Sequence, residues 1–380
     1  MRTRLGLLFL GWVVLIGTYP AQAQPILGTA WTNNQTILFW ASTYATNYVL
    51  QFKSKLLSTN WVLFTDVAPV AYGSQAAVTI LHPTHAGFFR LIQIPTTSSD
   101  GMVFIPASSF TIGDTLDGES DAIPTNVYVS SFYISTNLVS FAQWQTVFNY
   151  AISQGYDFDL NDGIGNATNQ PVQSVDWYDV VKWSNARSQQ AGLTAVYYTD
   201  PRMNYVYTNG DVDAVYADFT ANGYRLPTEA EWEKAARGGL SGQRFPWGNT
   251  ISENQANYHS DPDDFSYDLG PDGYNSSYDS GAFPYTSPVG AFPANGYGLN
   301  DMAGNVFEWC WDWYAGVPYP TNSAYLGGSN PTGPASSPVG GRVLRGGSWG
   351  GFASFARCAN RAFGPEITPD AIGFRCVKSP

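Results

Sequence analysis

The chain has 380 residues, of which only 13% are charged and 16% are aromatic. Its formal net charge of −12 argues against nucleic acids and anionic membranes as partners, because both select basic faces. A chain of this length is expected to form more than one domain. Abundant glycine and proline, together with many aromatic residues, favour a loop-rich fold that is stabilised by aromatic packing.

Residues 1–23 have the pattern of a secretory signal peptide. Arg2 and Arg4 precede an apolar run from Leu5 to Ile16, and Ala21-Gln22-Ala23 ends the segment. A charged start, a short apolar run and small residues at the end are typical of a cleaved leader. The run is shorter than the ~20 apolar residues of a membrane span, although an uncleaved anchor is the alternative. We therefore expect a secreted or periplasmic protein with no membrane span after cleavage.

Residues 24–97 are predicted to form a small all-β sandwich, and they resemble accessory modules of secreted bacterial proteins. The segment consists of apolar or alternating runs separated by turn residues. The expected strands are Thr36–Trp40, Tyr48–Ser54, Trp61–Thr65, Ala76–Ile80 and Phe88–Ile94. His82 and His85 are interpreted as surface residues, because no carboxylate or cysteine partner accompanies them as a second type of metal ligand.

The stretch RLPTEAEWEKAARGG, residues 225–239, contains a helix start. Thr228 can cap the helix, and Glu231 three residues later can close a capping box. Glu229 and Glu231 resemble a carboxylate pair for acid–base catalysis. However, residues two apart on a helix do not face each other, so we assign both to the scaffold.

Glu308 lies within an apolar, aromatic strand-like run, and its charge must be satisfied because burying it unpaired is very costly. A metal cation is one solution and an arginine is the other. Residues 245–341 contain ten carboxylates and neither lysine nor arginine, which weakens the arginine alternative, although Arg345 or Arg361 could reach. Seven of these carboxylates lie within residues 253–279, a run that is usually a solvated loop but also contains ligand types of calcium.

Three stretches together resemble the formylglycine-generating enzyme, or sulfatase-modifying-factor, family. They are residues 225–239, GLNDMAGNVFEWCWDW at 298–313, and RGGSW…RCANR…GFRC in 345–380. The resemblance covers about residues 101–377. It implies that residues 98–380 form an α+β, loop-rich domain of the formylglycine-generating-enzyme-like fold, which is related to C-type lectins.

The resemblance also implies the order of elements. It places strands at 101–106, 110–113 and 128–134, helices at 140–150 and 179–190, and a hairpin-bearing insertion at 192–222.

The oxidase chemistry of this family uses a cysteine pair just beyond the GGS turn. That pair binds copper(I), because soft thiolates favour this ion. The corresponding positions fall among residues 350–355, GGFASF, which contain no cysteine. Ser348 matches an active-site serine of the family, but one hydroxyl cannot replace two thiolates. The resemblance therefore predicts neither copper binding nor a confident catalytic residue.

The remaining cysteines allow at most one intramolecular disulfide. Cys358 and Cys376 match disulfide cysteines of the family, whereas Ala236 and Ser184 stand where their partners would be. We predict a Cys310–Cys358 disulfide, because similar sequences often have a cysteine in the EWC turn and one after GGSW. A Cys358–Cys376 disulfide and three free thiols are the alternatives.

The family holds structural calcium, and the resemblance implies two candidate sites. The first matches side-chain oxygens of Asp301 and Glu308 and the backbone oxygens of two residues between them, Gly304 and Val306. The second matches Asn257 and the Tyr258 carbonyl, with Asp279 as its acid. Asp279 sits two residues early, because an alignment without gaps places Gly281 at the aspartate position.

The function that we predict is a secreted family member with structural calcium and a binding or structural role rather than an oxidase role. The expected ligand is a peptide, a glycan or a secreted protein. Its binding surface is expected to consist of aromatic residues: Trp309, Trp311, Trp313, Tyr314, Trp349 and Phe352.

Two alternatives remain open. One is a variant oxidase of the formylglycine-generating or pyoverdine-maturation type, acting on a secreted peptide or a small molecule. The other is a diversity-generating target protein, although the variable positions of such proteins are rich in Asn, Tyr, Asp and Ser, unlike Gly350–Phe355. The sulfoxide synthases of the family are excluded, because their iron-binding histidines lie on a helical domain that has no counterpart here.

Overall fold

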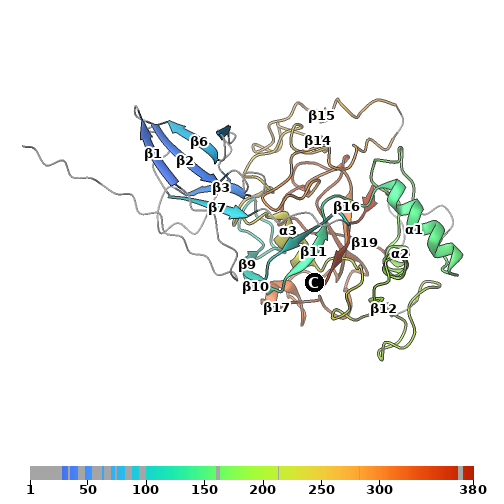
Figure 1. Cartoon of the computed structure of the whole chain (residues 1–380). Helices are drawn as coiled ribbons and strands as arrows, with labels where there is room; N and C mark the ends of the chain where they lie inside the picture. Colours follow the sequence, from blue (N-terminus) through green and yellow to red (C-terminus); the bar gives the residue numbers. More distant parts are fainter. Residues whose placement is uncertain are drawn as a thin grey trace, which may run out of the picture. The chain divides into compact units, whose positions relative to one another are not determined.

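The computed structural model describes seven strands between residues 28 and 93, and residues 100–380 except 160–162, 213, 282 and 367–370. Contacts along the chain divide it into two compact units, residues 1–94 and 95–380 (Figure 1). The expected signal peptide and both His82 and His85 lie outside the described residues. No helix in the described part of the chain is long and apolar enough to cross a membrane.

The first unit contains two antiparallel sheets. One has the strand order β1-β2-β6-β5 and the other β4-β3-β7. The strands are β1 Gly28–Thr32, β2 Gln35–Ala41, β3 Tyr48–Lys53, β4 Val62–Leu63, β5 Val70–Tyr72, β6 Gln75–Leu81 and β7 Phe88–Gln93. All five expected strands are present, while β1 and the three-residue β5 were not predicted.

The second unit is built from several small sheets. The orders are β21-β11-β8, β17-β10-β9 and β19-β18-β16-β20, with two-stranded ribbons β12-β13 and β14-β15. The first five strands are β8 Met102–Ile105, β9 Ser108–Ile112, β10 Thr125–Val129, β11 Phe132–Ser135 and β12 Tyr197–Tyr198. Next come β13 Tyr216–Ala217, β14 His259–Ser260, β15 Gly273–Tyr274, β16 Phe307–Trp313 and β17 Gly328–Ser329. The last are β18 Arg342–Arg345, β19 Ala362–Gly364, β20 Ile372–Gly373 and β21 Val377–Lys378.

Side-chain caps set the starts of the three α-helices. In α1, Phe141–Ser153, the hydroxyl of Ser140 accepts a hydrogen bond from the Gln143 amide. In α2, Trp177–Gln190, Asp176 accepts from the Asp179 amide in the same way. The predicted capping box of α3, Glu229–Ala236, is confirmed. A 3₁₀ helix, η2, covers Ala324–Leu326.

The single strand predicted over residues 128–134 is wrong. The chain forms β10 up to Val129 and β11 from Phe132, and these strands belong to different sheets. Ser130 and Ser131 interrupt the apolar alternation, and the Ser130 amide donates to Asn330 Oδ1 over 2.7 Å. The two serines therefore end β10, and the chain continues as β11 in a different sheet. The hairpin expected within 192–222 is confirmed by β12 and β13.

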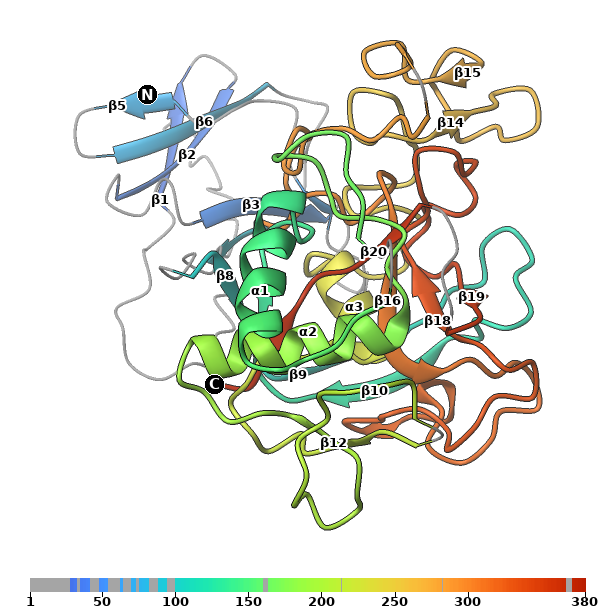
Figure 2. The same ribbon diagram turned by 90° about the vertical axis from the view of Figure 1, so that its right-hand side faces the viewer.

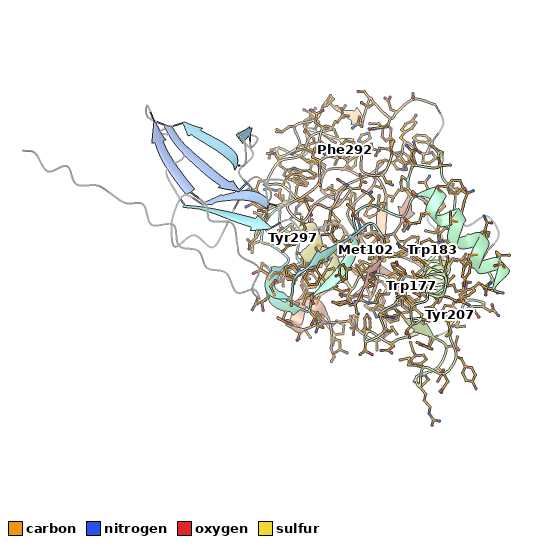
Figure 3. The ribbon with its side chains drawn as sticks, viewed as in Figure 1. Met102, Trp177, Trp183, Tyr207, Phe292 and Tyr297 are labelled. Atoms are coloured by element: carbon orange, nitrogen blue, oxygen red, sulfur yellow. The ribbon has the colours of Figure 1, made fainter. Side chains whose placement is uncertain are left out.

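Aromatic side chains fill the core of the second unit. Trp144 of α1 and Trp183 of α2 stack with ring centroids 5.8 Å apart. Trp177, Trp183 and Tyr207 belong to the same core and are labelled in Figure 3. Figure 2 shows α1 and α2 together on one side of this unit, and β14 with β15 at one end of it. This packing supports the expectation that aromatic contacts, rather than long amphipathic helices, stabilise the fold.

Candidate functional site

The GGS turn at the end of β18 places Ser348 in the structure. Gly346 and Gly347 both adopt positive φ angles, +91° and +74°, and a Cβ on Gly347 would lie 3.0 Å from the Ala356 amide nitrogen. Only glycine adopts this conformation without strain in so little space. Ser348 itself is buried, with 5% of its surface exposed.

The loop that follows Ser348 is held by backbone hydrogen bonds to two distant segments. The Trp349 amide donates to the Asn305 carbonyl over 2.8 Å, and the His259 amide of β14 donates to the Gly351 carbonyl over 3.0 Å. These bonds attach residues 349–351 to the turn before β16 and to the acidic segment. The loop is thus a fixed part of the fold, at the place where the family has its cysteine pair.

This loop presents aromatic rings to solvent. Phe352 and Phe355 are 39% and 38% exposed, while Ala353 between them is fully buried. Residues 350–355, among which the resemblance places the two thiolates of the oxidase, therefore contain two partly exposed phenyl rings and no cysteine.

Trp349 belongs to a group of four rings that we call the Trp349 cluster: Tyr274, Phe283, Tyr285 and Trp349. The ring of Phe283 stacks on Trp349 at 5.3 Å, and Tyr285 meets Trp349 edge-on at 5.5 Å. Phe283 is 62% exposed, so the cluster reaches the surface. His259 extends it, because its ring contacts both Tyr274 at 4.5 Å and Phe352 at 5.1 Å. Ring contacts of this kind stabilise a rigid apolar surface.

The aromatic surface predicted from the sequence is only partly correct. Trp309 is fully buried, and its indole nitrogen donates to the Val175 carbonyl over 2.8 Å. Trp313 packs on the Arg342 guanidinium at 3.6 Å, and Tyr314 packs on Phe363. Of the six predicted residues, Trp349 and Phe352 belong to the surface described above. The rings of Tyr274, Phe283 and Tyr285 were missed, although their segment is visibly rich in aromatic residues.

The acidic segment around the Trp349 cluster is mostly solvated. Asp263, Asp264, Asp272 and Asp279 are exposed. Asp268 is buried and has a structural role, because it accepts hydrogen bonds from the Ser260 hydroxyl over 2.9 Å and from the Asp261 amide over 2.8 Å. Most of the carboxylates in 253–279 therefore contribute negative charge to the surface beside the cluster.

All three thiols are buried and unbonded in the structure. Burial raises the pKa of Cys358 to about 12 and also raises the pKa of Cys310 and Cys376. A thiol with so high a pKa is rarely the thiolate that nucleophilic attack or metal binding requires. None of the three is therefore arranged as a reactive cysteine.

The disulfide prediction is not settled by these contacts. Cys310 and Cys358 lie in the same hydrophobic cluster as Ala236, while Cys376 lies in the neighbouring one. Ser184 lies near Cys376, and its hydroxyl donates to the Val180 carbonyl over 2.8 Å. The Cys310–Cys358 disulfide stays a prediction, since the structure has both as free thiols.

Glu308, the candidate calcium ligand on β16, is paired with an arginine. Arg375 binds both of its carboxylate oxygens, with Nε to Oε2 at 2.7 Å and Nη2 to Oε1 at 2.9 Å. Both side chains are fully buried. The arginine alternative is thus the one observed, but the residue is Arg375 rather than Arg345 or Arg361.

The other candidate ligands of this site fit an ion in part. Asp301 is buried, and its Oδ1 has no hydrogen-bond partner, which burial makes costly. Burial raises the pKa of Asp301 to about 6. Gly304 and Val306, which follow Asp301 in the sequence, are also buried. An ion at this site would lie beside Arg375, whose positive charge would repel it. The calcium site formed by Asp301, Gly304, Val306 and Glu308 stays a prediction.

The residues of the second calcium set each make hydrogen bonds within the fold. Asn257 is buried and its amide donates to the Tyr285 carbonyl over 2.8 Å. The Tyr258 hydroxyl donates to Asp268, whereas Asp279 is exposed, and its amide donates to the Asn275 carbonyl. No hydrogen bond or ion pair of the described residues joins Asp279 to Asn257. This site also stays a prediction.

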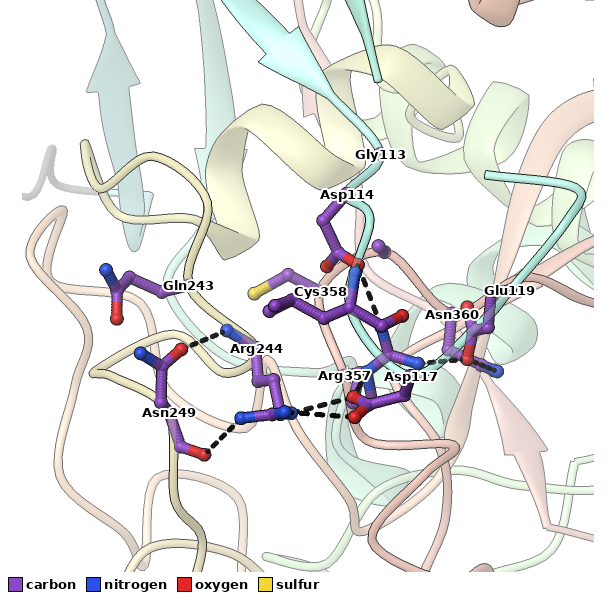
Figure 4. A network of polar contacts seen from close by, with 12 residues as sticks. Gly113, Asp114, Asp117, Glu119, Gln243, Arg244, Asn249, Arg357, Cys358 and Asn360 are labelled. Carbon is purple, nitrogen blue, oxygen red and sulfur yellow. Dashed lines mark hydrogen bonds and ion pairs between the residues drawn. The ribbon is translucent and has the colours of Figure 1, made fainter. Parts of the chain in front are cut away.

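The carboxylates of α3 are scaffold residues, as predicted. Glu231 pairs with Arg225 at 2.6 Å, and Glu229 pairs with Arg361 at 2.7 Å. Behind the loop, Arg357 pairs with Asp114 at 2.9 Å and with Glu119, as Figure 4 shows. These buried ion pairs fix the segment that leads from Phe355 to Cys358.

Comparisons with known proteins show the family. The sulfatase-modifying factor enzyme 1-like domain family matches residues 89–380. The chain belongs to this family. It is 33% identical to the formylglycine-generating enzyme of Mus musculus over 301 residues, which cover 73% of this chain and 74% of that enzyme.

Two further proteins are similar to this chain. The chain is 31% identical to the chaperone protein LppX of Paenibacillus barcinonensis over 239 residues, 60% of this chain and 77% of that protein. Among solved structures, Treponema denticola variable protein 1 superposes with a TM-score of 0.55 at 30% identity and covers 73% of this chain and 95% of its own. The expected α+β, loop-rich fold of the sulfatase-modifying-factor family is confirmed.

Proposed function

We propose that this family member is secreted and binds a segment of another secreted protein, and that it does not perform thiol-dependent oxidation. The observation that carries the proposal is the loop after Ser348. It contains no cysteine in residues 350–355, among which the resemblance places the two thiolates of the family's oxidases, and the three cysteines of the chain are buried elsewhere with raised pKa values.

A peptide segment fits the surface chemically. The Trp349 cluster offers rigid rings for apolar or aromatic side chains, at little cost in conformational entropy. Tyr274 of the cluster lies in the segment 253–279, which has exposed carboxylates, and residues 245–341 contain no lysine or arginine. Complementary charge then favours a peptide with basic residues. A relative that is called a chaperone supports a protein as the partner.

Secretion rests on the pattern of residues 1–23, with its charged start and short apolar run. Cell fractionation combined with N-terminal sequencing tests it. We expect the mature protein outside the cytoplasm with its N-terminus near Gln24.

A binding measurement tests the role of the surface. Residues 24–380 would be titrated with peptide libraries that contain aromatic and basic residues, and with an array of glycans. We expect saturable binding of peptides that weakens at least about tenfold in Phe283→Ser and Phe352→Ser, because each removes an exposed ring from the surface. Phe363→Ser is the matched control, since Phe363 is 48% exposed and packs on Tyr314 instead.

The outcomes separate the alternatives. Binding of glycans but not of peptides would show that the ligand is a glycan, and the proposed binding surface would remain the same. Equal losses in all three variants, or no loss in any, would show that the Trp349 cluster is not the binding site. The variant-oxidase alternative predicts instead that a cysteine peptide is chemically changed, which the same incubation followed by mass spectrometry detects.

A further inference from the structure

A hollow of about 330 Å³ lies at the helices α1 and α2, whose positions are visible in Figure 2. One side chain that lines it is an arginine, and none is acidic. The lining residues are Gln143, Thr146, Val147, Arg187, Gln190, Ala191 and Tyr224. The lining therefore carries one positive charge and no negative charge, in a chain whose formal net charge is −12.

Arg187 is buried without a carboxylate partner among the described residues. Only 7% of its surface is exposed, and its Nη1 has no hydrogen-bond partner. Its guanidinium lies 3.8 Å from the centre of the Tyr224 ring and 5.8 Å from that of the Trp183 ring, and the Cys376 thiol is also close. Two rings and a thiol compensate a buried positive charge far less than a carboxylate does.

The surroundings of Arg187 do not supply the missing negative charge. The nearby Asp100 accepts from the Tyr224 hydroxyl over 3.1 Å and pairs with Lys378. The Thr146 hydroxyl donates to the Ala142 carbonyl over 2.8 Å, so its proton is already used. The donors that remain for a ligand are Arg187 and the side-chain amides of Gln143 and Gln190.

We propose that this hollow binds the carboxylate group of a small organic acid or of a peptide C-terminus. A guanidinium with two flanking amides matches the planar fork of a carboxylate. A phosphate or sulfate carries more negative charge and binds best where several cations or backbone amides converge, whereas the lining contains a single cation. The walls at Val147 and Ala191 are apolar, and the volume accommodates a ligand of about dipeptide size.

This site is independent of the Trp349 cluster, because none of its lining residues belongs to that surface. A carboxylate ligand could therefore bind while the loop after Ser348 holds its own partner. The failure of either proposal leaves the other standing.

The test uses residues 24–380 and a matched pair of probes, N-acetyl-alanyl-alanine and its C-terminal amide, which differ in the carboxylate alone. Binding would be followed by ligand-observed NMR and by calorimetry at low salt. We expect the acid to bind and the amide to bind at least about tenfold more weakly, because the amide lacks the charge that pairs with Arg187. Inorganic phosphate is a third probe and should not compete.

Substitutions on the exposed end of α2 locate the site without disturbing the core. Gln190→Glu adds a negative charge at the hollow and should weaken binding of the acid at least about tenfold. Gln189→Glu adds the same charge one residue away, where Gln189 faces Gln154, and should leave binding nearly unchanged. Arg187→Gln should abolish binding, although this buried position also affects folding.

Three results would overturn the proposal. They are equal binding of the acid and the amide, equal effects of Gln190→Glu and Gln189→Glu, and no detectable binding of the acid at millimolar concentration. Phosphate that competes with the acid would also overturn it, because the hollow would then be a general anion site.

Discussion

At the scale of single residues, the central structural feature is the buried pair of Glu308 and Arg375. Two hydrogen bonds at 2.7 Å and 2.9 Å join them, and Arg375 also donates to the carbonyls of Ser135 and Asn300. Arg375 therefore links the C-terminal GFRC stretch to β16 and to the turn before it. Removing one partner would leave the other charge buried and unpaired.

We predict that Glu308→Gln lowers the free energy of unfolding by about 3–5 kcal/mol, because Arg375 loses its counter-charge. Urea denaturation measures the loss. The double variant Glu308→Gln with Arg375→Met is the control, and it should lose less than the sum of the two single variants. A loss below 1 kcal/mol in Glu308→Gln would mean that this pair contributes little.

Thermal unfolding tests whether Asp301 and Glu308 bind calcium. A bound ion stabilises the native state by ~2.7 kcal/mol at a hundredfold excess over the dissociation constant. If Asp301 and Glu308 hold calcium, the melting temperature of the wild type rises with calcium relative to chelator, and Asp301→Asn abolishes the rise. Identical midpoints in calcium and chelator would leave Arg375 as the only cation that Glu308 has.

Lys234 supplies a prediction on pH. It is buried, and it donates to the carbonyls of Pro106 and Val129 over 2.6 Å and 3.1 Å. Burial lowers its pKa from 10.5 to about 8, so between these values the folded state binds fewer protons than the unfolded chain. The free energy of unfolding should then rise with pH, by roughly 2 kcal/mol between pH 7.5 and 9.5. Denaturation at several pH values measures this, and Lys234→Met should remove the slope.

A wild-type stability that is flat or falls over this range, or a slope that persists in Lys234→Met, would contradict the assignment to Lys234.

At the scale of elements, α3 is where local sequence signals agree with the structure. Thr228 accepts from the Glu231 amide over 3.2 Å, and the Glu231 carboxylate accepts from the Thr228 amide over 2.9 Å. Glu231 also pairs with Arg225, so the box joins the helix start to the preceding strand-like segment. These contacts connect a local motif to the tertiary structure.

We predict that Thr228→Ala destabilises the protein by about 1 kcal/mol, because a helix amide loses its acceptor. Thr228→Ser keeps the hydroxyl and should lose less than half of that amount. Thermal and urea unfolding of the three proteins provides the comparison. An equal loss in both variants would assign the effect to the methyl group of Thr228 rather than to the cap.

The start of α3 could be predicted from the sequence because a cap acts within three or four residues, whereas the helix expected at 179–190 begins at Trp177, with Asp176 as its cap. The division of residues 128–134 between two sheets could not be predicted, since it depends on which distant strands accept them. The strand β10 pairs with β9, whereas β11 pairs with β8 and β21. The short strands β1 and β5 were missed for the same reason, because their pairing with β2 and β6 decides their existence.

At the scale of the whole molecule, the fold was predictable because three long motifs are shared with the family. The site was predictable only in part. The sequence alone shows that no cysteine pair follows the GGS turn, which marks the positions where the family has one. The partner of Glu308 could not be predicted from the sequence, because Arg375 lies 67 residues further along the chain. The Trp349 cluster and the hollow at Arg187 also depend on segments that only the fold brings together.

We propose that the protein uses the family scaffold for binding in place of thiol oxidation. Its reactive-cysteine positions are occupied by residues 350–355, and its own thiols are buried. Residues 350–355 therefore lack the pair of thiolates that would bind copper(I) for the conversion of a substrate cysteine.

The most direct test incubates residues 24–380 with a sulfatase-type CxPxR peptide, copper, reductant and oxygen, and follows the mass of the peptide. An active formylglycine-generating enzyme treated identically is the control. We predict an unchanged peptide mass with this protein, together with saturable peptide binding that Phe283→Ser and Phe352→Ser weaken. The mass loss that accompanies conversion of cysteine to formylglycine would contradict the account and identify the protein as an oxidase.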